Sequence, residues 1–169
     1  GGVTTYLSVL PGDFVADLYQ IHTTRLLERN VRSYLTARNA TNRGILATIE
    51  EQPEYFVAFN NGLTITANSA TLNADKSAIT SLDNVQIVNG GQTTNTIYRA
   101  KYLEKLDLSK ISVPAKICVL DDDMANEIAP KIAAFANQQS LVKKTDIASS
   151  NSTYRKIETL SRSIVAPAR

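Results

Sequence analysis

The sequence predicts an α/β protein, with mixed α and β elements in a single domain that covers residues 1–169. Short runs of alternating apolar and polar residues predict strands, and apolar residues at spacings of three and four predict helices between them. A chain of 169 residues with 43% hydrophobic residues is long enough for one core and too short for two of ordinary size. We expect a mixed sheet with flanking helices and one strand-GlyGly-helix-strand unit.

The N-terminal part begins with a strand and continues mostly as helix. Val3 to Leu10 is rich in β-branched residues and ends at Pro11-Gly12, which predicts a strand and a turn. Residues 13–35 predict one long helix or two short ones, with an apolar face formed by Phe14, Leu18 and Ile21. A further short helix is expected between Thr41 and Pro53.

The middle of the chain predicts several strands around one helix. Leu63, Ile65 and Ala67 alternate with threonines, and the Asn-Gly pair before them predicts either a hairpin turn or the end of a helical turn. One or two strands are expected over 78–88, a helix over 93–106 and a strand over 113–119. A strand, a helix and a strand in this order predict a right-handed parallel crossover.

The junction in "QIVNGGQTTNTIYRA", residues 86–100, is the strongest candidate site. Where a strand ends in two glycines and a helix follows, the first backbone N–H groups point at one spot, which suits a phosphate or a carboxylate. Gly90 and Gly91 would permit close approach, and Gln92, Thr93 and Thr94 would add side-chain donors. The alternative is plain turn chemistry, because glycine is the default residue for a positive φ.

The segment "DDDMANEIAPKIAAFANQQ" predicts an acidic helix. Its expected apolar face is Met124, Ile128, Ile132 and Phe135, with a kink or a break at Pro130. Asp121 to Asp123 suit the start of a helix without any metal, since carboxylates favour that end of the helix dipole. A last helix is expected from about residue 145 to 164.

Composition gives little direct information about function. The formal net charge of +2, from 18 basic and 16 acidic residues, does not by itself indicate binding to nucleic acid or to a membrane. The single cysteine, Cys118, favours a reducing, cytoplasmic setting, and His22 has no partners for a zinc site, so no metal and no cofactor is predicted. The start at Gly1 and the lone Met124 indicate a piece of a longer protein.

Three separated blocks resemble a known family. "NVRSYL" at 30–35, "FNNGLTI" at 59–65 and "QIVNGGQTTNTIY" at 86–98 look like the signature blocks of the AIPR family, the abortive infection phage resistance proteins of bacteria. The similarity continues through "FANQQSLVKKTD" at 135–146. This resemblance implies a role in bacterial antiviral defence.

The layout is also similar to that of the ParB, sulfiredoxin and DGQHR superfamily, in which the glycine loop holds a nucleotide or a phosphate. That likeness implies a ParB/sulfiredoxin-like core. The chain lacks the arginine of that superfamily after its glycine, which argues against nucleotide hydrolysis. It also has Gln92 in place of the sulfiredoxin cysteine, which argues against that activity.

These observations define the candidate site and three functions. The favoured one is binding of a nucleotide or nucleic acid at the Gly-Gly loop, extended by a basic stripe of Arg25, Arg29 and Arg32, which Arg38 and Arg43 follow. The alternatives are a metal-dependent nuclease that uses Asp121 and Glu127, and a module that senses a phage or host protein. No complete catalytic constellation is visible, and the oligomeric state is not predicted. The predicted ligand-binding residues are Arg32, Asn60, Asn61, Asn89, Gly90, Gly91, Gln92, Thr93, Thr94, Asn137 and Gln138.

Overall fold

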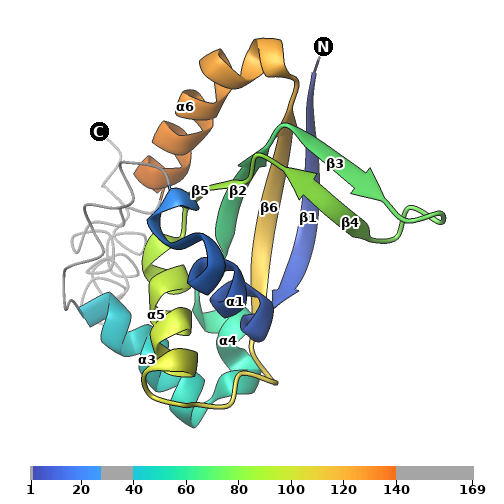
Figure 1. The fold of residues 1–169 in the computed structure, drawn as a ribbon. Coiled ribbons are helices and arrows are strands. Elements are labelled where there is room, and N and C mark those ends of the chain that lie inside the picture. Colours follow the sequence, from blue (N-terminus) through green and yellow to red (C-terminus); the bar gives the residue numbers. More distant parts are fainter. Residues whose placement is uncertain (1, 28–39, 140–169) are drawn as a thin grey trace, which may run out of the picture. The chain divides into compact units, whose positions relative to one another are not determined.

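The computed structural model describes residues 2–27 and 40–139 (Figure 1). The chain divides into two compact units, Gly1–Ala136 and Asn137–Arg169. Only residues 137–139 of the second unit are described, so the predicted extent of a single domain over 1–169 stays a prediction, and the expected helix over 145–164 lies outside the described residues.

The first unit contains a mixed α/β fold. Its elements are β1 (Val3–Pro11), α1 (Gly12–His22), the short helix η1 (Thr23–Arg25), α3 (Ala40–Glu51), η2 (Pro53–Tyr55), α4 (Phe56–Phe59), β2 (Leu63–Ala67), β3 (Ser69–Leu72), β4 (Ile79–Asp83), β5 (Gln86–Asn89), α5 (Gly91–Tyr102), β6 (Ser112–Leu120) and the start of α6 (Asp122–Gln139).

Four strands form the main sheet in the order β1-β6-β2-β5. β6 pairs antiparallel with β1 and parallel with β2, while β5 pairs antiparallel with β2. The mixed sheet confirms the predicted fold class. Strands β3 and β4 form a separate antiparallel hairpin that projects from the sheet (Figure 1).

The predicted parallel crossover through the glycine junction is wrong. β5 and β6 are not neighbours, because β2 lies between them, and their directions are opposite. The parallel pair is β2 with β6, which the chain joins only after passing through the hairpin, β5 and α5. Local periodicity identifies a strand but does not say which strand pairs with it, and this is why the sequence pattern missed the topology.

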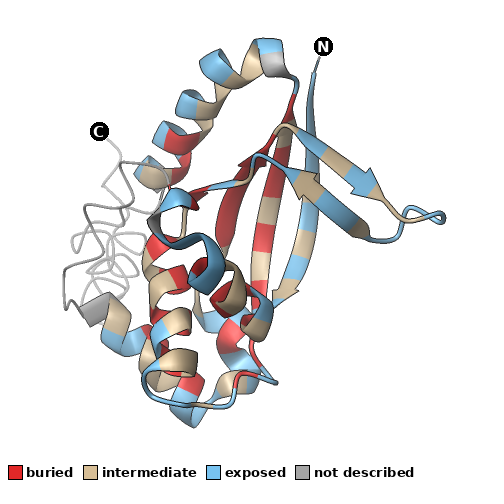
Figure 2. Ribbon diagram, viewed as in Figure 1, coloured by how far each residue is buried: buried red, intermediate tan, exposed pale blue. Residues whose placement is uncertain are grey.

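The main core lies on the face of the sheet that carries Ile65, Ile87 and Ile117. These side chains are buried together with residues of α1 and α5 such as Val15 and Ile97. Figure 2 shows the buried residues concentrated in β2, β6 and α5, while β1 and the hairpin are mostly exposed or intermediate. Every residue of β2 is buried, so both faces of the central sheet are covered along this strand.

Two helices bury their predicted apolar faces only in part, since Leu18, Met124, Ile128 and Ile132 are half-buried. In α1 the buried residues are Gly12, Val15, Ala16 and Tyr19, while Phe14 and Ile21 are 50% and 72% exposed. In α6, Ala133 and Ala136 are buried and Phe135 is 64% exposed, and the helix continues through Pro130 without a break. Large apolar residues can remain at the surface, so an apolar residue at helical spacing need not lie on the face that meets the sheet.

A charged cluster joins α1 to α5. The Lys101 ammonium lies 2.9 Å from Asp13 and 2.6 Å from Asp17, and the Tyr102 hydroxyl donates a hydrogen bond of 2.7 Å to Asp17. The hydrogen bond from Lys101, followed by that from Tyr102, lowers the pKa of the Asp17 carboxyl. The bonds to Asp17 and Asp13 raise the pKa of Lys101. The cluster therefore favours the charged forms of both partners.

This cluster predicts how stability changes with pH. Because the folded state lowers the pKa of Asp17 below its ordinary value of 3.8, Asp17 stabilises the fold above that pH, and the contribution is lost as pH falls through the folded value. Asp17→Asn should have a lower melting temperature than the wild type at pH 7, and this difference in melting temperature should be smaller at pH 3. Thermal melts of both proteins at the two pH values measure the difference. A difference of the same size at both pH values would contradict the assignment.

Candidate ligand-binding site at the start of α5

The turn from β5 into α5 depends on a left-handed glycine. Gly90 is the N-cap of α5 and has φ of 97° and ψ of 14°. Residues other than glycine rarely adopt this left-handed backbone conformation. The first helical hydrogen bond runs from Thr94 N to Gly90 O over 2.9 Å, and the Thr94 hydroxyl donates to the same oxygen over 3.1 Å. The chain therefore changes from strand to helix within one residue.

Close backbone packing brings two of the sequence blocks together at this turn. A Cβ atom on Gly90 would lie 2.5 Å from Leu63 Cδ2 and 3.1 Å from Gly62 O. A Cβ atom on Gly62 would lie only 2.1 Å from the carbonyl oxygen of Pro114. The starts of β2 and β6 thus meet the end of β5, and the "FNNG" and "NGG" segments lie against each other. Steric need alone accounts for Gly62 and Gly90.

The first turn of α5 begins with backbone donors that have no partner within the helix. Because the helical hydrogen bonds begin at Thr94, the amides of Gly91, Gln92 and Thr93 make no bond within the helix. Gly91 and Thr93 are buried, while Gln92 is half-buried. No acidic side chain stands in this first turn, so the positive end of the helix dipole is not neutralised there. This geometry suits an anion.

The asparagines that were predicted to bind the ligand have different surroundings in the structure. Asn60 caps α4, since both its backbone N–H and its Nδ2 donate to the carbonyl of Phe56, at 3.1 and 3.3 Å. Asn61 is exposed, one residue before Gly62. Asn89 Nδ2 donates to the carbonyl of Ala136 in α6, so this amide ties α6 to the end of β5. Asn60 and Asn89 thus serve the fold directly.

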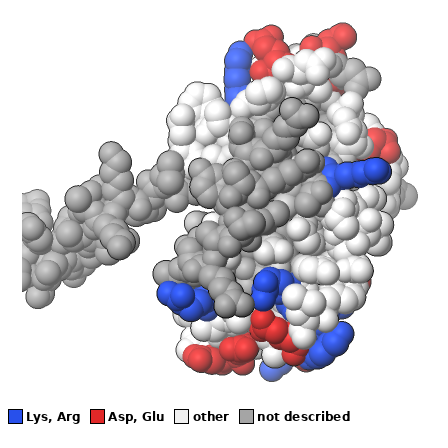
Figure 3. Space-filling model, turned by 60° about the vertical axis from the view of Figure 1, so that its left-hand side comes forward, with Lys and Arg blue, Asp and Glu red and all other residues white. Residues whose placement is uncertain are grey.

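The remaining predicted residues belong to other parts of the chain. Arg32 lies outside the described residues, as do Arg29 of the basic stripe and Arg38, which follows it. Arg25 and Arg43 are both exposed, on η1 and α3. Asn137 and Gln138 lie in the last turn of α6 and belong to the second unit. In Figure 3 the Lys and Arg side chains of the described residues are scattered over this side of the molecule, with Asp and Glu among them.

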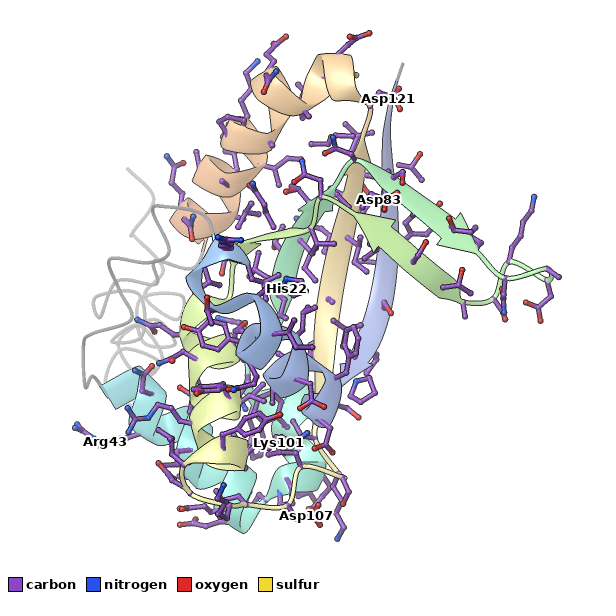
Figure 4. The ribbon with its side chains drawn as sticks, in the orientation of Figure 1. His22, Arg43, Asp83, Lys101, Asp107 and Asp121 are labelled. Carbon is purple, nitrogen blue, oxygen red and sulfur yellow. The ribbon has the colours of Figure 1, made fainter. Side chains whose placement is uncertain are left out.

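The two carboxylates that the nuclease hypothesis would use, those of Asp121 and Glu127, have different surroundings. Glu127 binds Lys131 at 2.7 Å on the exposed flank of α6, and this hydrogen bond lowers the pKa of its carboxyl. Asp121 instead lines a hollow with Asp83, and Figure 4 shows these two residues before α6 and at the end of β4. Within residues 2–27 and 40–139, no group of three or more His, Cys, Asp or Glu side chains could hold a metal ion.

A polar cleft on the other face of the sheet was missed by the sequence argument. It lies between α6 and the strands β2 and β5, and its polar residues include Asn68, Asn84, Gln86 and Asn126. These residues are far apart in the sequence, and only the pairing of β2 with β5 and the return of α6 bring them together. The one feature of the sequence that could have indicated this cleft is that its four amide residues lie near the ends of strands and near the start of a helix.

The packing at Gly62 leads to a prediction with a matched control. Gly62→Ala should lose about 2–4 kcal/mol of unfolding free energy, because the new methyl group must displace the Pro114 carbonyl. Gly44→Ala, in α3, should gain about 0.5–1 kcal/mol, since nothing lies within 4 Å and alanine favours a helix. Urea unfolding curves of the two variants measure both effects. Equal effects of the two substitutions would contradict the close contact.

Comparison with known proteins agrees with the sequence blocks at the junction. The family model described as AIPR protein matches residues 27–167. Neither a curated protein nor a solved structure matches the chain, so the likeness to ParB and sulfiredoxin stays a prediction. Among the described residues, no helix is both long enough and apolar enough to cross a membrane. The chain belongs to the AIPR family, and this membership suggests a role in abortive-infection phage resistance.

Proposed function

We propose that this domain serves phage resistance by binding a phosphate-bearing ligand, a nucleotide or a nucleic acid, at the first turn of α5. The observation that supports it is the run of amides at Gly91, Gln92 and Thr93, which follow a left-handed glycine and precede the first helical hydrogen bond. Successive N–H groups at a helix start are a recurring phosphate site, because they combine directed donors with the positive end of the dipole.

The surrounding packing favours such binding because it holds the donors in place. Gly90 is held between Leu63 and Gly62, and Thr94 bonds to the Gly90 carbonyl through both its amide and its hydroxyl. Donors that are fixed before the ligand arrives lose little entropy on binding. The half-buried Gln92 side chain stands in the same turn as a further donor.

The charge distribution favours a small ligand over a long nucleic acid. A protein that follows a nucleic-acid backbone presents several Lys and Arg residues along one track. On the parts of the surface in Figure 3 that are not drawn in grey, the Lys and Arg residues stand apart from one another, and the net charge of the chain is only +2. A nucleotide needs only one or two phosphate contacts, which three amides can supply.

A charge placed in the first turn of α5 tests the proposal. Gln92→Glu should keep or raise the melting temperature of the free protein, because a carboxylate at a helix start is favourable by about 0.3–1 kcal/mol. The same carboxylate should repel phosphate and remove the ligand-induced shift. In the wild type, a nucleotide at ten times its dissociation constant should stabilise the fold by about 1.4 kcal/mol, a shift of a few degrees. Thermal-shift assays against nucleotides, short DNA and short RNA measure it.

Gln52→Glu is the matched control, because it adds the same charge at an exposed position after α3. This variant should respond to the ligand as the wild type does. The proposal fails if no nucleotide, DNA or RNA stabilises the wild type. It also fails if Gln92→Glu keeps the full ligand-induced shift.

A further inference from the structure

The cleft on the α6 side of the sheet consists of two adjoining hollows that share Asn68 and Asn84. The first, of about 290 Å³, lies between α6 and the ends of β2, β5 and β6. The second, of about 460 Å³, opens beside the base of the β3–β4 hairpin. Together they offer room for several residues of an extended chain.

The first hollow has an apolar floor and a polar rim. Val88 and Leu120 of the sheet lie opposite Ala129 and Ala133 of α6, and all four line it. Gln86 and Asn126 stand on the two sides with exposed amides. Val88 and Leu120 are each 1% exposed, so the hollow ends on closely packed apolar side chains, while the amides at its rim can bond to the backbone of whatever occupies it.

The second hollow is lined by two acids, and the carboxylate of one of them, Asp83, is held by a hydrogen bond. Ser69 Oγ donates a hydrogen bond to the Asp83 carboxylate, and Asn68 N donates to the backbone oxygen of Asp83 at 2.9 Å. Asn84 Nδ2 donates to Asn68 Oδ1 at 3.1 Å, and Asn84 itself has a left-handed φ of 50°. Asp121 lines the same hollow from the start of α6 (Figure 4). Among the described residues that line the two hollows, none is a Lys, Arg or His.

We propose that this cleft binds an extended segment of a partner protein, which presents an Arg or Lys side chain to Asp83 and Asp121 and a small apolar side chain to the floor. The two carboxylates select a cation, and charge complementarity of this kind steers and orients protein partners. The amides at the rim satisfy the backbone of the segment. A phosphate-bearing ligand is disfavoured here, because the two carboxylates would repel it.

This site goes beyond the function proposed for α5. Its residues differ from those of the first turn of α5, and its charge preference is the opposite. A protein segment at the cleft and a nucleotide at α5 can therefore be tested separately on the same chain.

A short peptide with a neutral twin tests the proposal. We would titrate the ¹⁵N-labelled chain with acetyl-Ala-Ala-Arg-Ala-Ala-amide and with the same peptide carrying citrulline, which has nearly the shape of arginine but no charge. The arginine peptide should cause saturable shifts in the amide signals of Asn68, Asn84 and Asn126. The citrulline peptide should bind about tenfold more weakly, the loss expected for two exposed charge pairs.

Paired variants separate the cleft from general electrostatics. The double variant Asp83→Asn with Asp121→Asn should bind the arginine peptide about tenfold more weakly than the wild type does. The control is the double variant Asp75→Asn with Asp107→Asn, which removes the same charge from two exposed aspartates elsewhere that accept hydrogen bonds from serines. Its affinity for the arginine peptide should stay within about twofold of the wild type.

Three outcomes would overturn the proposal. The first is equal binding of the arginine and citrulline peptides, and the second is equal loss of affinity in the two double variants. The third is binding of free spermidine as tight as that of the peptide, because the cleft would then recognise a small cation and not a protein segment. The comparison of the two peptides uses the wild type only, so it decides the matter even if a variant does not fold.

Discussion

The close contact of two glycines with neighbouring backbone and side-chain atoms is the constraint on which the rest of this fold depends. Gly62 lies where any Cβ would meet the Pro114 carbonyl, and Gly90 lies against Leu63 in a left-handed conformation. Through these contacts β2 can lie between β5 and β6, and α5 can start with a single residue between it and the end of β5. A side chain at either position would separate the strands or displace the helix start.

The same short strand, β5, contributes to both candidate sites. Its last residue leads into Gly90 and the amides of α5, while Gln86 and Val88 line the cleft beneath α6. The bond from Asn89 to the Ala136 carbonyl joins the α6 wall of the cleft to the glycine junction. The two sites are thus separate in chemistry, one suited to anions and one to cations, but they share a strand and a helix.

The sequence predicted most elements because strands and helices depend on local patterns. Alternation in β2 and β6 and the asparagine-glycine signals placed the strands, and Pro53 placed the end of α3. It did not predict that β2 separates β5 from β6, since strand pairing depends on the whole chain. It also included Phe14, Ile21 and Phe135 in the apolar faces of α1 and α6, although these three side chains are exposed. Neither the strand patterns nor the helix patterns predicted the cleft, because only the tertiary structure brings Asn68 and Asn126 together.

The central claim is that the amides at the start of α5 receive a phosphate. A titration of the ¹⁵N-labelled chain with inorganic pyrophosphate at constant ionic strength tests it most directly. The account predicts saturable shifts centred on the amides of Gly91, Gln92 and Thr93, with little change at lysine-rich parts of the surface. Shifts that follow the lysine and arginine residues, or amides of these three residues that do not respond, would contradict it.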